Sequence, residues 1–393
     1  MTIISLKNNL AKYLKLMQKE MASEFTFFPK TWIFPSESYD LMNFMQEKKK
    51  PMTLIVKPTN SSQGKGIFLT RKIKDIPRDS CHVVQQYKSF PYLLEGKKFD
   101  LRLYCLVTQV CPDLQAFLYH DGLGRFATEN YSGSTNSENL CMHLTNYAIN
   151  KDSEKFQENE SEFKKSLKET LALVQEQEGE EAVVKLQQEF KDIIIKTLLV
   201  GLPHLEHNYR TCSSKSSYQN NRQCFQILGF DIMLDKKLKP WLLEVNESPS
   251  FNDDTDVDKL VKGGLIEDTL RLLDIKKHQK QKIKELAQNK SVFQRNKLNQ
   301  MTEEQIQEKQ VKDEQQMLTQ QRNHEIFQNK NLGGYERIFP IKIKTKQGWT
   351  EDENQEQAEL LAKKELYDNI KEVSKGLFNN QFGGKKKQPS LLE

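Results

Sequence analysis

The stretch from Cys224 to Phe251 constrains the fold more than any other part of the chain. It reads CFQILGFDIMLDKKLKPWLLEVNESPSF, and its two apolar runs, rich in β-forming residues, flank a polar connector from Asp235 to Pro240. This pattern predicts a β-hairpin with largely buried strands. Since side chains two positions apart on a strand share a face, Glu244 and Asn246 should point the same way.

A hairpin that is symmetric about its connector places Asp231 directly opposite Glu244, so that two carboxylates face each other among hydrophobic residues. Like charges so placed repel, and burying them unpaired is costly. We therefore expect a positive charge between them. Two carboxylates and the amide oxygen of Asn246 form a hard-oxygen set that suits Mg²⁺. The alternative is a surface hairpin whose acids face water, which the apolar flanking residues disfavour.

Composition narrows the class of protein. A length of 393 residues suits roughly two or three domains, and an apolar content of only 37% indicates that part of the chain lies outside a core. The six cysteines include no C-x-x-C pair, so neither a zinc site nor a disulfide framework is indicated. The N-terminus lacks the apolar core of a signal peptide, and no run approaches the roughly twenty apolar residues of a membrane span. We expect a soluble intracellular protein.

A glycine-containing loop lies between two β-rich runs in TLIVKPTNSSQGKGIFLT. The first run ends at Lys57 and Pro58, and the second begins at Ile67. A Walker loop needs G-x-x-x-x-G-K-[ST] at the start of a helix, and neither the spacing nor the IFLT continuation fits. A flexible glycine loop between strands can still fold over a triphosphate, with its backbone N–H groups and Lys65 facing the anion. An ordinary hairpin turn is the competing interpretation.

A strand further along the chain, in KKFDLRLYC, alternates polar and apolar side chains. Lys98, Asp100, Arg102 and Tyr104 share one face, because successive side chains of a strand point to opposite sides. A solvated outer face is the simplest interpretation. However, this face carries two cations and an acid and would lie beside a candidate nucleotide loop. That combination favours a surface that binds anions.

The composition changes near Lys276, which divides the chain into a domain over 1–275 and an extension over 276–393. The extension begins with the strongly basic KKHQKQKIKELAQNKSVFQRNK, continues as Gln-rich helical sequence, and includes a second charged helix over 352–376 before the basic tail GGKKKQPS. A charge run is often a solvated face, whereas a cationic arm would suit a polyanionic partner. No nucleic-acid module is recognisable, so we expect an acidic protein partner and no nucleic acid.

Seven motifs occur in the order, and near the spacing, found in one enzyme family: VKP…SQGKGIF, QQY, KKFDLRLY, RFAT, HLTNYAINK, GFDIMLD and KPWLLEVNESPSF. Together they resemble the tubulin tyrosine ligase-like enzymes, which have an ATP-grasp fold, over about Phe27 to Ile275. GYERIFP, further on, resembles a segment downstream of the catalytic domain in the polyglutamylase branch. The implied fold is mixed α/β (α+β), with ATP held between two β-sheet lobes covered by helices.

The resemblance also implies roles for individual residues. ATP would be bound by Lys57, Gln63, Gly64, Gln85, Gln86, Tyr87, Lys88, Lys98, Phe99, Asp100, Thr145 and Asn146. Mg²⁺ would be held by Asp231, Glu244 and Asn246, in agreement with the hairpin argument. Free L-glutamate would be bound by Arg125, Tyr147, Lys262 and Lys164, with Lys165 as the alternative to Lys164. The catalytic residues would be Lys98, Arg102 and Glu244.

The activity implied by the resemblance is ATP-dependent polyglutamylation of tubulin. ATP would convert an acceptor carboxylate into an acylphosphate, and the amino group of glutamate would attack it to form an isopeptide bond. Mg²⁺ and the lysine and arginine side chains would stabilise the converging anions. The acceptors would be the acidic tails of tubulin, to which the basic segment after Lys276 is suited. We expect a monomer in the cytoplasm, acting on the cytoskeleton at a cilium or basal body.

A few positions separate branches of the family. Gln63 resembles chain-elongating members, whereas several chain-initiating members have arginine there, so we expect elongation. Lys88 stands where an apolar residue is common, Ala148 replaces a frequent serine, and the N-terminal portion is shorter than usual. Three other interpretations stay open: a polyglycylase of the same fold, a non-catalytic microtubule-binding protein, and a ligase for small molecules, which has no use for a basic arm.

Overall fold

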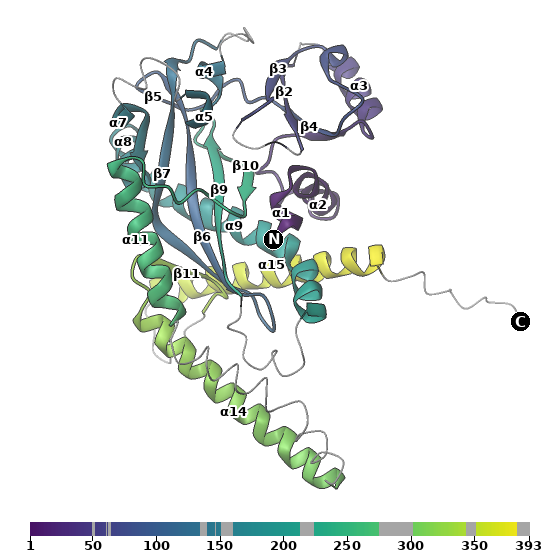
Figure 1. The fold of residues 1–393 in the computed structure, drawn as a ribbon, viewed down its shortest axis with the longest axis vertical. Coiled ribbons are helices and arrows are strands. Elements are labelled where there is room, and N and C mark those ends of the chain that lie inside the picture. Colours follow the sequence, from purple (N-terminus) through teal and green to yellow (C-terminus); the bar gives the residue numbers. More distant parts are fainter. Residues whose placement is uncertain are drawn as a thin grey trace, which may run out of the picture.

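The computed structural model describes residues 1–48, 52–59, 61, 64–133, 140–145, 147–150, 160–212, 224–274, 302–342 and 351–382. These residues form two β-sheets surrounded by helices, as Figure 1 shows. The mixed α/β class predicted from the sequence is therefore confirmed. Within the described ranges, no helix is long and apolar enough to span a membrane.

The smaller sheet has four strands in the order β1-β4-β2-β3. The strands are β1 (Thr31–Phe34), β2 (Leu54–Pro58), β3 (Phe68–Thr70) and β4 (His82–Gln86), and all neighbours are antiparallel. A 3-10 turn (Ile73–Asp75) follows β3, and helix α3 (Ser38–Glu47) packs on the sheet around its own core, which includes Phe34, Leu41 and Val56. The antiparallel pairing of β2 with β3 confirms the predicted strand, loop, strand arrangement.

The larger sheet has seven strands, five of them in the order β10-β9-β6-β7-β11. Its strands are β5 (Leu93–Leu94), β6 (Lys97–Gln109), β7 (Gln115–Asn130), β8 (Lys164–Ser166), β9 (Gln226–Leu234), β10 (Pro240–Asn246) and β11 (Tyr335–Phe339). Strand β5 pairs with β6, and β8 pairs with β7. The hairpin predicted over Cys224 to Phe251 is the antiparallel pair β9–β10.

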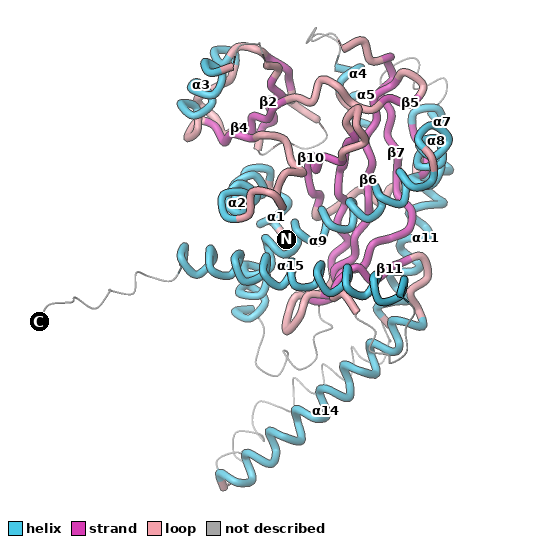
Figure 2. Tube along the Cα trace, turned by 180° about the vertical axis from the view of Figure 1, so that it is seen from behind, coloured by secondary structure: helices cyan, strands magenta, loops and turns pink. Residues whose placement is uncertain are grey.

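Helices cover both faces of this sheet. On one face lie α8 (Leu167–Glu178) and α9 (Glu180–Cys212), with α15 (Glu351–Phe382) against α9, as Figure 2 shows from behind. On the other face, α11 (Asp256–Leu273) packs on β6 and β7 through a second apolar cluster that includes Leu106, Phe117 and Leu265. Short helices α4 (Leu140–His143), α5 (Tyr147–Asn150) and α7 (Glu160–Phe163) lie near the end of β7.

Local sequence explains where the covering helices begin and why α9 is central. Ser166 and Glu169 form a capping box that starts α8, which satisfies backbone N–H groups left free in the first turn. The middle of α9, from Ile193 to Leu205, is apolar on nearly every side and buried throughout. A helix that is hydrophobic all round must lie inside the protein. Because both faces of β6 are covered, the solvated outer face considered for its polar residues is not present; Tyr104, for example, is buried.

The N-terminal helices join the two sheets. The N-terminal residues form α1 (Thr2–Ser5) and α2 (Lys7–Glu20), and α2 buries Leu10, Leu14 and Met17. Helix α2 contacts β1 and β4 of the smaller sheet and β10 of the larger one. It therefore lies where the two sheets meet, which is visible in Figure 1.

The C-terminal extension contributes to the larger sheet. Its strand β11 pairs with β7, Tyr335 lying opposite Tyr119, so residues assigned to the extension complete the sheet edge. Helix α14 (Glu303–Lys330) projects away from the rest of the molecule (Figure 1). Both α14 and α15 contain more Asp and Glu than Lys and Arg. The basic charge predicted for the extension is thus concentrated in 276–297 and the final tail, which lie outside the described residues.

Candidate nucleotide and metal site

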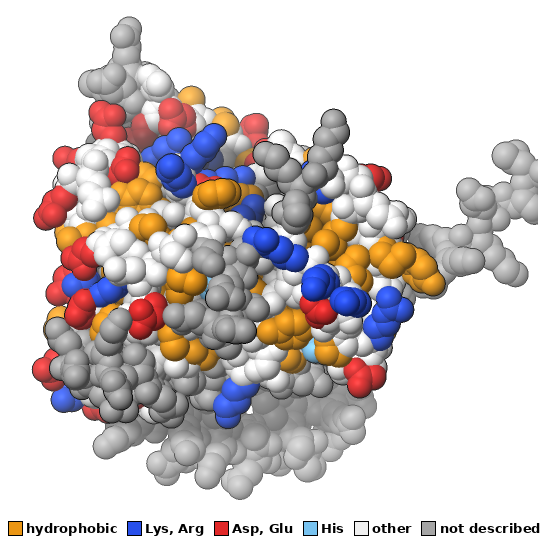
Figure 3. Space-filling model, turned by 90° about the horizontal axis from the view of Figure 1, so that it is seen from above, with side chains coloured by type: hydrophobic (Ala, Val, Ile, Leu, Met, Phe, Trp, Pro, Cys, Tyr) orange, Lys and Arg blue, Asp and Glu red, His pale blue; other side chains and the backbone are white. Residues whose placement is uncertain are grey.

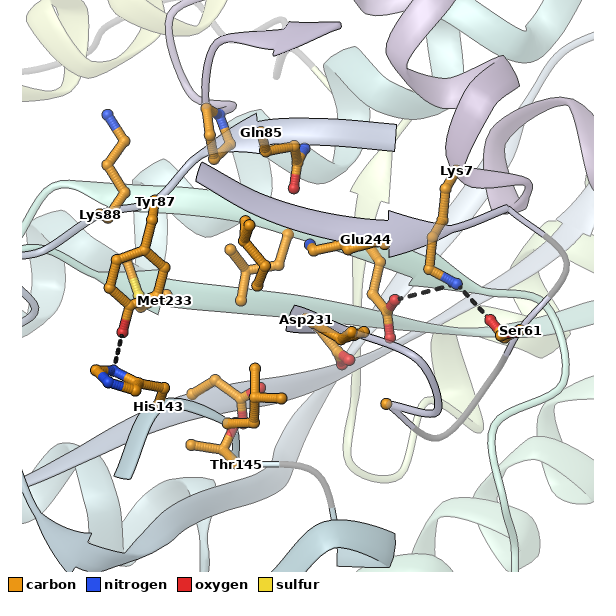
Figure 4. Close-up of a pocket in the computed structure, with 18 of the residues that line it drawn as sticks. Lys7, Ser61, Gln85, Tyr87, Lys88, His143, Thr145, Asp231, Met233 and Glu244 are labelled. Atoms are coloured by element: carbon orange, nitrogen blue, oxygen red, sulfur yellow. Dashed lines mark hydrogen bonds and ion pairs between the residues drawn. The ribbon is translucent and has the colours of Figure 1, made fainter. Parts of the chain in front are cut away.

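A cleft lies between the smaller sheet and the β9–β10 hairpin of the larger one. It holds about 980 Å³ of empty space, part of it open to solvent. Strands β2 and β4 line one side, strands β6, β9 and β10 line the other, and residues 143–145 close one end (Figure 4). Of the residues predicted for the nucleotide and the metal, the cleft is lined by Lys57, Gly64, Gln85, Gln86, Tyr87, Lys88, Lys98, Asp100, Thr145, Asp231, Glu244 and Asn246.

The three predicted metal ligands converge in this cleft. Glu244 is the cross-strand partner of Asp231, which confirms the register inferred from the symmetry of the hairpin. The amide nitrogen Nδ2 of Asn246 lies 3.4 Å from Asp231 Oδ2 and 3.4 Å from Glu244 Oε1. A β-bulge between Leu242 and Glu244 shifts the register just before these residues. The strand geometry therefore brings all three side chains to one point.

The positive charge expected beside Asp231 comes from two arginines. Arg102 binds Asp231 in a bidentate pair, with Nη2 2.8 Å from Oδ2, and Arg125 Nη2 lies 2.9 Å from the same oxygen. Burial raises the pKa of Asp231, but the two guanidinium groups more than offset this and hold the pKa well below its usual range. Asp231 is therefore ionised without a metal. The positive charge that the hairpin argument required is thus present in the protein itself.

These residues nonetheless fit a divalent cation. Each carboxylate oxygen can accept more than one partner, so an ion can share Asp231 with the arginines. The amide of Asn246 points its nitrogen at the two acids, and half a turn about its last torsion would present the oxygen, the atom that Mg²⁺ requires. Among the described residues no group of three or more His, Cys, Asp or Glu could hold a metal. The amide of Asn246 is what completes the set.

Two buried ammonium groups face the same cleft. The side chains of Lys57 and Lys98 are each only 7% exposed. Lys98 Nζ donates to the carbonyl oxygen of His143 at 2.7 Å and to the hydroxyl of Tyr87 at 3.2 Å. Burial lowers the pKa of Lys98 to about 8, although Asp100 opposes the shift. Neither lysine has a carboxylate within ion-pair distance among the described residues, so the cleft is electrostatically prepared for an anion.

One end of the cleft combines apolar and polar groups in the way that a purine base would require. Ile55 and Met233 line it beside Gln85, whose Nε2 donates to Thr31 Oγ1 at 3.0 Å. Lys88, which stands where an apolar residue is common in the resembling family, places Nζ 3.2 Å from the centroid of the Trp241 ring. Burial lowers the pKa of Lys88 to about 8. The indole face accommodates this cation.

The side chain of one predicted nucleotide contact lies outside the cleft, and three further predicted site residues lie, wholly or in their side chains, outside the described part of the chain. The side chain of Phe99 is in the core, with its ring stacked on Phe126 at a centroid distance of 5.4 Å, because alternation along β6 turns it away from Lys98 and Asp100. Its side chain therefore does not line the cleft. Gln63 and Asn146 lie outside the described residues, and so does the side chain of Tyr147.

Three of the residues predicted to bind the amino acid, Arg125, Lys164 and Lys262, form a second cluster next to the cleft. Arg125 is the cross-strand partner of Lys164, and its Nη2 lies 2.6 Å from Asp100 Oδ2. Lys164 and Lys262 both contact Asp258, Lys262 with its Nζ 2.7 Å from Oδ1. The alternative Lys165 points elsewhere, 6.0 Å above the Phe126 ring. The structure thus groups Lys164, rather than Lys165, with Lys262.

Asp258 is the anion that holds this cluster together. Its side chain is fully buried at the start of α11, where Thr255 caps the helix. Burial raises the pKa of Asp258, and hydrogen bonds from Lys164 and Lys262 outweigh it, so that the pKa lies below its ordinary value. The carboxylate occupies the place where the two ammonium groups meet. An incoming carboxylate would compete for the same cations.

The cleft also contains residues that the sequence reasoning missed. His143 contacts the hydroxyl of Tyr87 through Nδ1 at 3.0 Å, and Lys7 reaches the cleft from α2. The HLTN motif includes His143, so its position next to Thr145 was a usable signal. No local pattern distinguishes Lys7 from the other lysines of its helix, because its place depends on how α2 packs between the sheets.

Comparison with known proteins identifies the family of this chain. Residues 1–282 match the model of the tubulin-tyrosine ligase family. The chain is 41% identical over 358 residues to a probable beta-tubulin polyglutamylase of Tetrahymena thermophila, an alignment that covers 88% of this chain and 29% of that protein. It is 39% identical over 361 residues to tubulin polyglutamylase TTLL7 of Mus musculus, covering 86% of this chain and 39% of the relative. It is 40% identical over 342 residues to tubulin polyglutamylase TTLL6 of Homo sapiens, covering 86% and 37%.

The chain therefore spans less than half the length of these curated relatives. The family match, in contrast, covers well over half of the chain and includes every strand of both sheets except β11. We conclude that this chain belongs to the tubulin-tyrosine ligase family.

Proposed function

We propose that this protein is an ATP-dependent ligase that joins free L-glutamate to glutamate side chains, or to existing glutamyl chains, on the tails of tubulin. One observation carries the proposal: Asp231, Glu244 and Asn246 converge in the same cleft as the buried ammonium groups of Lys57 and Lys98. That combination suits a triphosphate and its divalent cation. Relatives about 40% identical that are named tubulin polyglutamylases support the choice of reaction.

The reaction would proceed in two steps. An acceptor carboxylate attacks the terminal phosphorus of ATP, which releases ADP and forms an acylphosphate. The amino group of glutamate then attacks the acyl carbon, and phosphate leaves as the amide bond forms. Bound Mg²⁺, held by Asp231, Glu244 and Asn246, would supply positive charge to the phosphate oxygens. Lys57, on β2, would bind the same anion from the opposite side of the cleft, and Lys98, on β6, would bind it from the side of the metal ligands. Burial strengthens each of these charge interactions.

Arginine and lysine side chains near the cleft favour glutamate over glycine as the incoming amino acid. Arg125, Lys164 and Lys262 place three cations close together, with Asp100 and Asp258 as their present partners. Glycine has one carboxylate, whereas glutamate has two and gains more from such a cluster. We therefore favour polyglutamylation over polyglycylation. Gln63, which resembles chain-elongating members of the family, supports elongation rather than initiation.

The acceptor would be an acidic peptide that reaches the cleft from solvent. Figure 3 shows several separate groups of Lys and Arg side chains on one face of the molecule, with Asp and Glu side chains most numerous along its left margin. The basic segment at 276–297 would add long-range attraction to tubulin, which should weaken as salt rises. The protein would act as a monomer. Its site of action would be the cytoskeleton, at a cilium or basal body.

The proposal is tested by incubating the protein with ATP, Mg²⁺, microtubules and either labelled glutamate or labelled glycine. We expect label from glutamate in tubulin, none from glycine, and none in the Glu244→Gln variant. Glu181→Gln is the control, because Glu181 is exposed at the start of α9 and does not line the cleft. Labelling by Glu244→Gln equal to that of the wild type would overturn the metal assignment, and glycine transfer alone would replace the proposed substrate.

A further inference from the structure

Lys7, the first residue of α2, extends its side chain into the nucleotide cleft. Its Nζ donates to the carbonyl oxygen of Ser61 at 2.9 Å and lies 3.9 Å from Glu244 Oε2 (Figure 4). It lines the main cleft and also a small adjoining cavity between α2 and the two sheets. Lys7 is thus a cation directed at a proposed metal ligand from an element that carries none of the family motifs.

The fold holds Lys7 in this position. Leu10 and Leu14, one and two turns further along α2, are buried. Just before the helix, Ser5 Oγ donates to Glu247 Oε2 at 3.0 Å, which attaches the end of α1 to the chain that follows β10. The start of α2 is therefore fixed relative to Glu244. An ammonium group carried on a packed helix is held in place more firmly than one on a loop.

The simplest interpretation of the contact between Lys7 and Glu244 is an ordinary surface ion pair. Such pairs contribute little to stability. Two features argue against it. The Lys7 side chain is only 18% exposed, and the buried ammonium of Lys57 lies close enough to be affected by it. Burial lowers the pKa of Lys57, Glu244 opposes that shift, and Lys7 adds to it. Two ammonium groups held near one carboxylate repel each other until a further anion lies between them.

We propose that Lys7 is a positioning residue of the nucleotide site, which orients Glu244 toward Asp231 and Asn246 and supplies positive charge where the terminal phosphates would lie. The inference rests on the proposed function, because it places the nucleotide in this cleft. It adds a contribution from the N-terminal helix that links the two sheets. Binding of the triphosphate would then connect α2, the smaller sheet and the β9–β10 hairpin.

The test measures nucleotide binding without tubulin or glutamate. Calorimetric titrations with Mg²⁺ and a non-hydrolysable ATP analogue, and separately with AMP, compare the wild type with Lys7→Met, Lys7→Arg and Lys19→Met. Lys19 is the matched control because it lies on the same helix, is exposed and does not line the cleft. We expect Lys7→Met to weaken binding of the ATP analogue by roughly ten- to a hundredfold, the loss of one charge-assisted contact. Lys7→Arg should retain most of the affinity.

AMP separates positioning from a merely structural effect. AMP lacks the terminal phosphates, so its affinity should be the same in the wild type and Lys7→Met. A variant that simply disturbed the fold would lose affinity for both ligands. Equal affinity of Lys7→Met and wild type for the ATP analogue, or equal losses for the analogue and AMP, would overturn the inference while the proposed function stands. Absence of analogue binding by the wild type would overturn the proposed function, and the inference with it.

Discussion

Replacing Asp258 with asparagine perturbs a buried ion cluster beside the cleft. Asp258 is fully buried and neutralises Lys164 and Lys262, whose side chains are themselves 12% and 7% exposed. Asparagine has nearly the same shape and keeps one acceptor oxygen, but it removes the charge. Removing one partner of a buried ion pair costs about 3–5 kcal/mol. Because the amide still accepts one hydrogen bond, we expect the free energy of unfolding to fall by about 3 kcal/mol, the low end of that range.

Lowering the pH should reduce the difference in the free energy of unfolding between the wild type and Asp258→Asn. The folded-state pKa of Asp258 lies below its ordinary value, so its carboxylate stabilises the protein above the unfolded-state pKa. That contribution is lost as the pH falls through the folded-state pKa. We therefore expect the full difference at pH 7 and a smaller one in the acid range, where the wild-type side chain also becomes neutral.

The assay is urea unfolding followed by tryptophan fluorescence at several pH values. Asp256→Asn is the control, since Asp256 lies one half-turn earlier in α11, is fully exposed and pairs with Lys259 at the surface. Its free energy of unfolding should change by less than about 0.5 kcal/mol. A loss below about 1 kcal/mol for Asp258→Asn, or a loss that does not depend on pH, would refute the electrostatic account of the cluster.

Three further substitutions test separate parts of the site. Lys98→Met should weaken binding of an ATP analogue by roughly ten- to a hundredfold, while Lys97→Met, outside the cleft, should not; equal effects measured by calorimetry would contradict the role of Lys98. Lys262→Met should raise the KM for glutamate by roughly tenfold or more with the KM for ATP unchanged, and a rise in the KM for ATP alone would contradict the subsite. Phe99→Ala should lower the free energy of unfolding by about 3–5 kcal/mol, yet the folded variant should bind the ATP analogue normally; a specific loss of affinity would restore Phe99 to the site.

Much of the hairpin could be predicted because it is local. Its two apolar runs and short polar connector determine the register, so Asp231 and Glu244 could be paired without any knowledge of the rest of the molecule. The alternation along β6 predicted equally well that Lys98 and Asp100 share a face. The same alternation places Phe99 on the opposite face. Residue spacing therefore predicted the direction of the Phe99 side chain correctly, whereas its place in the KKFDLRLY motif suggested a nucleotide contact.

Contacts between distant segments could not be predicted in this way. Arg102 meets Asp231 because β6 and β9 are neighbours in the sheet, although 129 positions separate the two residues. The same applies to β11, whose pairing with β7 joins part of the C-terminal extension to the larger sheet. A strand pattern shows which face a side chain is on, but the partner strand is chosen by tertiary packing.

Sequence reasoning correctly required a positive charge beside Asp231 but did not foresee that two arginines supply it. Pairing by Arg102 and Arg125 satisfies the same electrostatic demand that a metal would satisfy. Charge balance alone therefore does not establish a metal site. A metal site is still favoured because Glu244 and Asn246 converge on the same point, next to buried lysines suited to phosphate.

Direct measurement of bound metal tests this central claim most sharply. Mn²⁺, an electron-spin probe that accepts the same oxygen ligands as Mg²⁺, would be titrated into the wild type with a non-hydrolysable ATP analogue, and into Glu244→Gln and Asn246→Leu under the same conditions. We predict that the wild type depletes the free Mn²⁺ signal beyond what the nucleotide alone binds, and that both variants lose this additional binding. Undiminished Mn²⁺ binding in both variants would show that these side chains do not hold the metal.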